Sequence, residues 1–141
     1  MIGIVIDASI ALAWCFPDEN SDYADGVLVA LEGKTILVPA VWSLELCNAV
    51  LVGERKKRLH KPEILRFTTL LEGLSVQEDV QSVGDHVNNV LPLAQQYNLS
   101  AYDAAYLELA IRHSAPLATL DSKLGKAAKQ AGVSIFGGAI I

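Results

Sequence analysis

Residues 2–7 read IGIVID, a run of apolar, mostly β-branched side chains that ends on an aspartate. An uninterrupted apolar run of this length is typical of a strand that is buried on both faces of a sheet. Two further short apolar runs, TILVP at 35–39 and PLATL at 116–120, follow along the chain. Each of the three runs predicts a strand.

The segments between these runs carry helical signals. Ser9 opens a short helix over 10–16 that Pro17 stops, and Gly33 stops a second helix over 23–33. Apolar residues with a helical period, or start and stop residues, predict further helices over 40–58, 62–73, 84–98, 101–113 and 123–132, with strands over 75–80 and 133–137. Strands that alternate with helices predict an α/β sandwich around a mainly parallel sheet, formed as one domain by residues 1–141.

The composition narrows the class of protein. Hydrophobic residues make up 52% of the 141 positions and charged residues 19%, which is enough apolar material for a core and excludes a disordered chain. No apolar run approaches the roughly 20 residues that span a bilayer. The first residues also lack the basic region and cleavage site of a signal peptide. We therefore expect a cytoplasmic protein without membrane contact, in which Cys15 and Cys47 are buried free thiols.

Four acidic residues stand in apolar surroundings. Asp7 closes the first strand, Glu45 lies in WSLELCNAV, Asp103 lies in SAYDAAYLELA, and Asp121 closes PLATLD. A buried carboxylate is strongly disfavoured unless it has a hydrogen-bond donor, a cation or a metal as a partner. Ligands of parallel α/β sheets gather at the carboxyl ends of the strands, which is where Asp7 and Asp121 are expected.

Each of these acids taken alone has a structural interpretation. Asp7 and Asp121 can each cap the helix that follows, and Asp103 can cap or enter the helix over 101–113. Glu45 is harder to explain in this way, because its helical neighbours are apolar on every side. One shared site for all four acids is a better interpretation than four unrelated structural roles.

The residue types indicate which metal such a site would hold. The three histidines are scattered and show no zinc-ligand spacing, so oxygen ligands remain. Mg²⁺ and Mn²⁺ prefer carboxylate oxygens and keep several waters, which leaves room for substrate phosphates. Such ions can activate water for hydrolysis of a phosphodiester. The sequence therefore predicts a Mg²⁺ or Mn²⁺ site built from Asp7, Glu45, Asp103 and Asp121.

Three stretches resemble the PIN-domain nucleases, and among them the VapC-type toxins of prokaryotic toxin–antitoxin pairs. They are VIDASIALAW, VPAVWSLELCNAV and YNLSAYDAAYLELAIRHSAPLATLDSKL, and the order of the four acids also matches the family. The resemblance implies a three-layer PIN-like sandwich and a metal-dependent endoribonuclease. It implies that Asp7, Glu45 and Asp103 form the catalytic metal site, with Asp121 acting through water or at a second metal.

The same resemblance implies supporting residues and partners. Ser9 and Thr119 match hydroxyl positions that support the carboxylates, and Asn48, one helical turn after Glu45, is expected to hydrogen-bond near the site. The implied partners are an RNA substrate, a cognate antitoxin that occupies the active-site groove, and a second copy of the chain in a homodimer.

Basic residues are concentrated although the net charge is −5. Five of them form one stretch: Arg55, Lys56, Lys57, Arg58 and Lys61. A positive cluster on an acidic protein can follow a phosphate backbone, which predicts an RNA-binding surface. The alternative is the solvated end of a helix, where cations are favoured by the helix dipole. Tyr97, Tyr102 and Tyr106 are interpreted as helix-packing residues.

Two other functions remain open at this point. A phosphatase or phosphotransferase of another α/β fold would use Asp7 as a covalent nucleophile, but such enzymes usually carry a second acid two residues on, where this chain has Ser9. A non-catalytic RNA-binding module of the same fold would not need all four acids.

Overall fold

The computed structural model describes residues 3–137 and contains a parallel sheet of four strands in the order β3-β2-β1-β4. The strands are β1 Ile4–Ile6, β2 Thr35–Pro39, β3 Ser75–Asp79 and β4 Leu117–Ala118. The predicted first strand began at Ile2, which lies outside the described residues. Val5 of β1 is opposite Leu37 on one side and Leu117 on the other, so β1 has a parallel neighbour at each edge.

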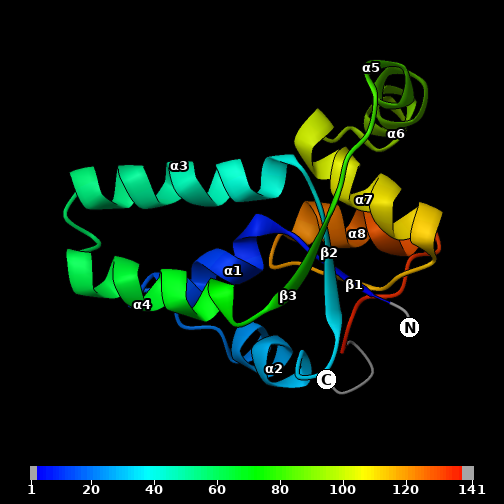
Figure 1. Ribbon diagram of the computed structural model, residues 1–141. Helices are drawn as coiled ribbons and strands as arrows, with labels where there is room; N and C mark the ends of the chain where they lie inside the picture. The colour runs from blue at the N-terminus through cyan, green and yellow to red at the C-terminus, as the bar shows by residue number, and fades with distance from the viewer. Residues whose placement is uncertain (1–2, 138–141) are drawn as a thin grey trace.

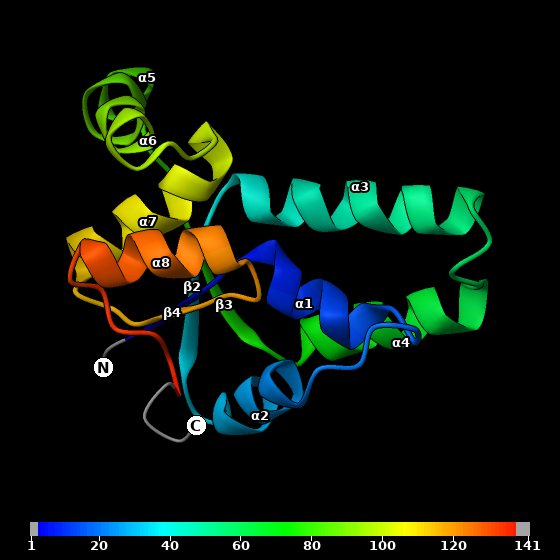
Figure 2. The same cartoon turned by 180° about the vertical axis from the view of Figure 1, so that it is seen from behind.

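Helices cover both faces of the sheet, as Figures 1 and 2 show from opposite sides. One group consists of α1 Ala8–Cys15, α2 Asp22–Ala30, α3 Val41–Arg55 and α4 Lys61–Glu72. The other consists of α5 Val83–Asp85, the π-helix η1 His86–Val90, α6 Leu91–Tyr97, α7 Ala101–His113 and α8 Ser122–Gln130. The predicted three-layer α/β sandwich is confirmed.

The core lies between the sheet and its helices. All three residues of β1 are buried, and α7 contacts both β1 and β2 through a face that includes Ala104 and Leu107. Burial of such apolar side chains contributes roughly 25 cal/mol per Å² to folding. No helix within residues 3–137 is long and apolar enough to cross a membrane.

Helices α3 and α4 form an arm that projects from the sheet, with α1 packed against both (Figure 1). The predicted helix over 40–58 is too long at its end, because α3 stops at Arg55. Lys57 adopts a left-handed conformation with φ of 60°, and the N–H groups of Arg58 and Leu59 both donate to the carbonyl of Gly53. A side chain at Gly53 would meet the ring of Phe16 at 2.6 Å, so only glycine permits this close approach.

The predicted helix over 84–98 is interrupted. Its middle is the π-helix η1, in which the N–H of Leu91 donates to the carbonyl of His86, five residues back. Pro92 follows at once. Proline has no N–H and collides with the carbonyl four residues earlier in a regular helix, and the wider π turn accommodates it.

Two smaller expectations also need correction. The predicted last strand, 133–137, pairs with β4 through one bridge, between Ile135 and Leu117, and Gly137 has a positive φ of 70°, which a strand does not adopt. Cys15 is buried as expected, but Cys47 is exposed because it lies on the outer face of α3. Both thiols are free.

Candidate active site

Asp7 stands where β1 ends and α1 begins. It is 4% exposed and is the one buried polar or charged residue among residues 3–137. Its backbone N–H donates to the carbonyl of Ala118 in β4, and its side chain accepts from the N–H of Ile10 as the N-cap of α1. The interpretation of Asp7 as a helix cap is therefore correct. Capping alone does not explain why Asp7 is buried, because a helix cap can lie at the surface.

Two hydroxyl groups hold the Asp7 carboxylate from either side. Ser9 Oγ donates to Oδ1 at 2.6 Å, and Thr119 Oγ1 donates to Oδ2 at 2.5 Å. Each hydroxyl also accepts a backbone N–H, that of Leu120 for Ser9 and that of Asp121 for Thr119. The segment 119–121 is thus tied to Asp7 through both hydroxyls, and the orientation of the carboxylate is fixed.

Glu45 lies on α3 and is half-buried. Tyr106 Oη of α7 donates to Glu45 Oε1 at 2.5 Å. Burial first, and then this hydrogen bond, keep the pKa of Tyr106 above its ordinary value, so Tyr106 remains the donor. The interpretation of Tyr106 as a packing residue was incomplete, since it is 1% exposed and also binds a predicted site residue. Its place three residues after Asp103 on one helix was the available signal.

Asp103 and Asp121 each lie in the first turn, or at the cap, of a helix. Asp103 is the third residue of α7, and its N–H donates to Ser100 Oγ, the cap of that helix. Asp121 caps α8 by accepting from the N–H groups of Lys123 and Leu124. Both side chains are half-buried. The positive ends of two helices therefore lie beside these carboxylates.

The four acids share one electrostatic environment. Burial raises the pKa of Asp7 to about 6, against the lowering effect of its hydrogen bonds, and the charge of Asp103 adds to the rise. Burial also raises the pKa of Glu45, again with a contribution from Asp103. The pKa of Asp103 is itself raised, by burial and then by the charge of Asp121. The charge of Asp103 thus raises the pKa of Asp7 and of Glu45, and the charge of Asp121 raises the pKa of Asp103.

The donor set is suited to a hydrated hard cation. Among residues 3–137 no group of three or more histidine, cysteine, aspartate or glutamate side chains is placed so that it could hold a metal ion, so there is no preformed protein cage. Mg²⁺ does not require one, because it is usually bound by one or two carboxylates and keeps several waters. Carboxylates that raise one another's pKa would be relieved by a cation between them. The residues therefore fit Mg²⁺ or Mn²⁺ held partly through water.

Asn48 shares helix α3 with Glu45 but, among the described residues, makes no contact that supports its predicted role. It is exposed, and within residues 3–137 no hydrogen bond joins it to any of the four acids. Tyr102 is 61% exposed, so its interpretation as a packing residue is wrong.

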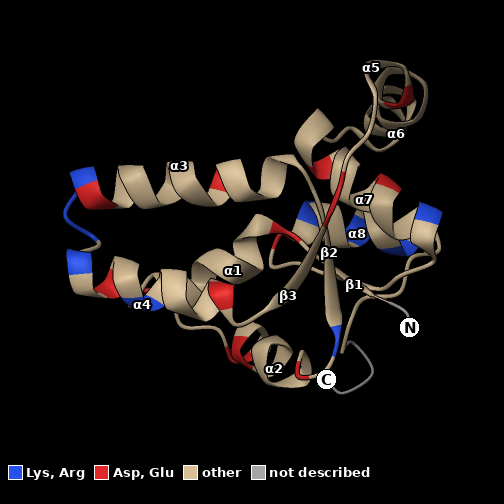
Figure 3. Cartoon of the chain, in the orientation of Figure 1, with Lys and Arg blue, Asp and Glu red and all other residues tan. Residues whose placement is uncertain are grey.

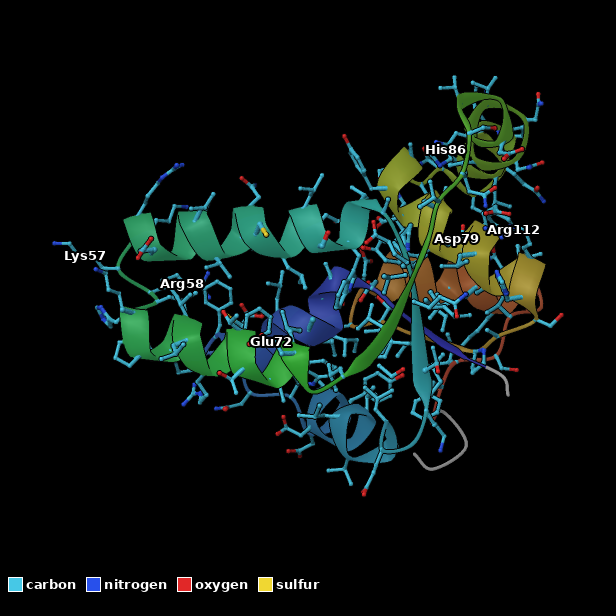
Figure 4. The ribbon with its side chains drawn as sticks, viewed as in Figure 1. Lys57, Arg58, Glu72, Asp79, His86 and Arg112 are labelled. Carbon is cyan, nitrogen blue, oxygen red and sulfur yellow. The ribbon has the colours of Figure 1, made fainter. Side chains whose placement is uncertain are left out.

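The basic stretch lies at the tip of the arm, at the end of α3 that is distant from the sheet (Figure 3). Arg58 (labelled in Figure 4) is exposed, but its side chain is paired: it lies 3.0 Å from Asp18 and 3.1 Å from Glu19, and its guanidinium lies 4.2 Å from the centre of the Phe16 ring. Arg55, Lys56, Lys57 and Lys61 are exposed. At 1.5 Å per helical residue, Arg55 lies about 15 Å along α3 from Glu45.

The centre of this candidate site is a buried aspartate at the end of the inner strand β1, and its pKa is raised in part by the charge of Asp103. The sequence matches the PIN domain over residues 4–130, so the chain belongs to this family. It is 29% identical over 124 residues to Ribonuclease VapC3 of Pyrobaculum aerophilum, a match that covers 87% of this chain and 92% of the relative.

Solved structures have the same fold. The crystal structure of PAE2754 from Pyrobaculum aerophilum superposes with a TM-score of 0.66 at 24% identity, covering 89% of this chain and 79% of the other. VapBC2 from Rickettsia felis, solved bound to a DNA fragment from its promoter, gives a TM-score of 0.64 at 16% identity, covering 96% and 97%.

Proposed function

We propose that this protein is a metal-dependent endoribonuclease that hydrolyses RNA phosphodiester bonds with water as the nucleophile. The observation that carries the proposal is the buried Asp7 carboxylate, oriented by Ser9 and Thr119 and joined electrostatically to Asp103 at the carboxyl ends of parallel strands. The relation to Ribonuclease VapC3 supports RNA as the substrate. The expected products carry a 5′-phosphate and a 3′-hydroxyl.

The chain's own residues prepare the site for this reaction. Because the pKa of Asp7 is about 6, its ionised form outnumbers its protonated form by about tenfold at pH 7, and the carboxylate is available as a ligand. Asp7, Glu45 and Asp103 would hold Mg²⁺ or Mn²⁺, with Asp121 supporting it or helping to hold a second ion. The bound ion supplies water activation and stabilisation of the leaving oxygen. Ser9 and Thr119 keep Asp7 in one orientation, because each hydroxyl is itself held in place by accepting a backbone N–H.

Two alternative functions fit the geometry less well. An enzyme that uses Asp7 as a covalent nucleophile would usually carry a second acid two residues on, where this chain has Ser9, and Ser9 instead donates to Asp7 Oδ1. A non-catalytic RNA-binding module would gain nothing from acids that raise one another's pKa.

We further propose that the protein is the toxin of a toxin–antitoxin pair and forms a homodimer. The structural likeness to VapBC2 supports this assignment. Two surfaces with exposed apolar side chains are available to such partners. The arm exposes Leu44, Leu51 and Leu65, and the region around α5 and η1 exposes Val80, Val83 and Val87. Co-purification with the product of a short neighbouring gene, and the mass of the isolated protein in solution, would test the two assignments.

The nuclease proposal is tested with purified protein and single-stranded RNA. Cleavage should require Mg²⁺ or Mn²⁺, stop with EDTA, and be lost in Asp7→Asn, and the fragments should accept ligation through a 5′-phosphate. Metal-independent cleavage, or full activity of Asp7→Asn, would overturn it. RNA binding without cleavage in the presence of metal would instead favour the RNA-binding module.

A further inference from the structure

The contact between Tyr106 and Glu45 joins two helices that are far apart in sequence. Glu45 belongs to α3 and Tyr106 to α7, and 61 residues separate them. Among residues 3–137, the Tyr106 hydroxyl is the one side-chain donor to the Glu45 carboxylate. The bond therefore fixes the position of a predicted ligand from the arm relative to the helix that carries Asp103.

Tyr106 is well suited to hold another group in place. It is 1% exposed and belongs to the face of α7 that packs on the sheet, so its ring cannot follow a moving partner. Glu45 is only half-buried and has three rotatable side-chain bonds, so it can turn toward solvent when nothing holds it. The rigid partner thus orders the mobile one.

The position of Tyr106 on its helix adds a second constraint. Residues three apart share a helix face, so α7 presents the Asp103 carboxylate and the Tyr106 hydroxyl side by side. Glu45, bonded to that hydroxyl, is then held at a fixed spacing from Asp103. The charge of Asp103 reaches Glu45, which agrees with this closeness. Within residues 3–137 the hydroxyls of Tyr97 and Tyr102 make no side-chain hydrogen bond to an acid. Tyr97 is half-buried and Tyr102 is 61% exposed.

We propose that Tyr106 is a positioning residue of the nuclease site, whose buried hydroxyl holds Glu45 Oε1 and leaves Oε2 available to the metal. The inference rests on the proposed function in one respect, that Glu45 is a metal ligand. Tyr106 itself touches neither metal nor substrate. Second-sphere partners of this kind commonly change metal affinity by 10- to 100-fold when they are removed.

The test measures Mn²⁺ affinity in the full chain without RNA, from the electron paramagnetic resonance signal of free Mn²⁺. Tyr106→Phe keeps the ring in the core and removes the hydroxyl, and should weaken Mn²⁺ binding by about tenfold or more. Tyr97→Phe is the matched control and should bind as the parent does. Circular dichroism and a thermal melt establish that each variant is folded.

A double-mutant cycle separates positioning from general damage to the fold. In the Glu45→Gln background, Tyr106→Phe should change Mn²⁺ affinity less than about twofold, because the ligand that it positions is already lost. Glu45→Asp keeps the charge but is one methylene shorter than the distance to Tyr106 requires. Glu45→Asp alone should lose Mn²⁺ affinity, a result that does not depend on any tyrosine variant folding well. Adding Tyr106→Phe to Glu45→Asp should change that affinity little.

The outcomes distinguish this inference from the proposed function. Equal Mn²⁺ affinity of the parent and Tyr106→Phe would overturn the positioning role while the nuclease proposal stands. An equal loss from Tyr106→Phe in the parent and in both Glu45 backgrounds would also overturn it, since the effect would not pass through Glu45. A parent protein that binds no Mn²⁺ would overturn the proposed function and this inference together.

Discussion

Thr119 donates a hydrogen bond to Asp7 across a sequence separation of 112 residues, and the same hydroxyl accepts the N–H of Asp121. This one side chain therefore joins the end of β1 to the segment that begins α8. We expect Thr119→Val to lower the free energy of unfolding by about 1–3 kcal/mol at pH 7, because it leaves a buried carboxylate oxygen and an amide without their partner. Thr119→Ser keeps the hydroxyl and should remain within about 1 kcal/mol of the parent. Urea unfolding of the three proteins provides the measurement.

The raised pKa of Asp7 predicts how stability depends on pH. In the folded state this pKa is about 6, above the ordinary value of 3.8, so the native state binds the proton more tightly than the unfolded state. The contribution of Asp7 to stability is therefore greatest below pH 4 and is lost as the pH rises through 6. The free energy of unfolding that Asp7 contributes falls by roughly 3 kcal/mol over this pH range.

Asp7→Asn isolates this contribution, because the other carboxylates titrate in both proteins. The free energy of unfolding of Asp7→Asn minus that of the parent, measured in EDTA, should increase from pH 4 to pH 7. A difference that is flat or decreases over this range would contradict the assigned shift.

Loss of individual acids should affect cleavage unequally. Asp7→Asn, Glu45→Gln and Asp103→Asn should each remove most RNA cleavage, because losing one ligand weakens both metal binding and water activation. Asp121→Asn should retain more activity, since asparagine caps α8 nearly as well as aspartate. Cleavage rates at several Mn²⁺ concentrations provide the test. Near-normal activity of one of the first three variants at limiting Mn²⁺ would show that the substituted residue is not a metal ligand.

Asp103 should show the opposite behaviour to a structural aspartate. Its charge raises the pKa of Asp7 and Glu45, so Asp103→Asn should leave the metal-free protein at least as stable as the parent. Its backbone N–H remains capped by Ser100 in the variant. Metal bound to the native state raises the melting temperature by mass action, and this gain should shrink in Asp103→Asn. Thermal melts with EDTA and with excess Mn²⁺ compare both quantities. A destabilised variant with an undiminished metal response would refute the ligand role.

The basic tip of the arm should act on RNA affinity alone. Replacing Lys56 and Lys57 by Gln should weaken RNA binding and reduce its dependence on salt, because fewer counterions are released. Metal affinity should not change, since Arg55, the residue before the two lysines, lies about 15 Å along α3 from Glu45. Arg58→Gln is the contrasting variant: it should lower the melting temperature slightly, through its contacts with Asp18, Glu19 and Phe16. An unaltered salt dependence in the lysine variant would mean that these residues form only the solvated end of α3.

The strands and most helices could be predicted because their signals are local. The apolar runs at 35–39 and 116–120 and the helix over 101–113, which the structure reproduces as α7, needed no tertiary information. The failures have tertiary or backbone causes. Lys57 ends α3 early by adopting a positive φ, which lets the N–H groups of Arg58 and Leu59 donate to the Gly53 carbonyl, and Pro92 is accommodated by a π turn.

The candidate site was predictable as a set of residue types and less so as a geometry. Four acids in apolar segments stand out in the sequence, and the structure brings them into one electrostatic environment. Tyr106 was assigned a packing role, because a tyrosine in an apolar helix gives no sign of which partner its hydroxyl meets. Arg58 forms its ion pairs with Asp18 and Glu19, which are 40 and 39 residues away in sequence. No local pattern reveals such partners.

The position of β1 between β2 and β4 also sets the order in which the site is completed during translation. A nascent chain can pair β1 with β2 once residue 39 has left the ribosome, but β4 and the Thr119 hydroxyl follow much later. Until then Asp7 lacks one of its two hydroxyl donors, and Asp121 has not left the ribosome either. Because domains fold as units while they are synthesised, the ribosome produces most of this nuclease before the carboxylates can be assembled.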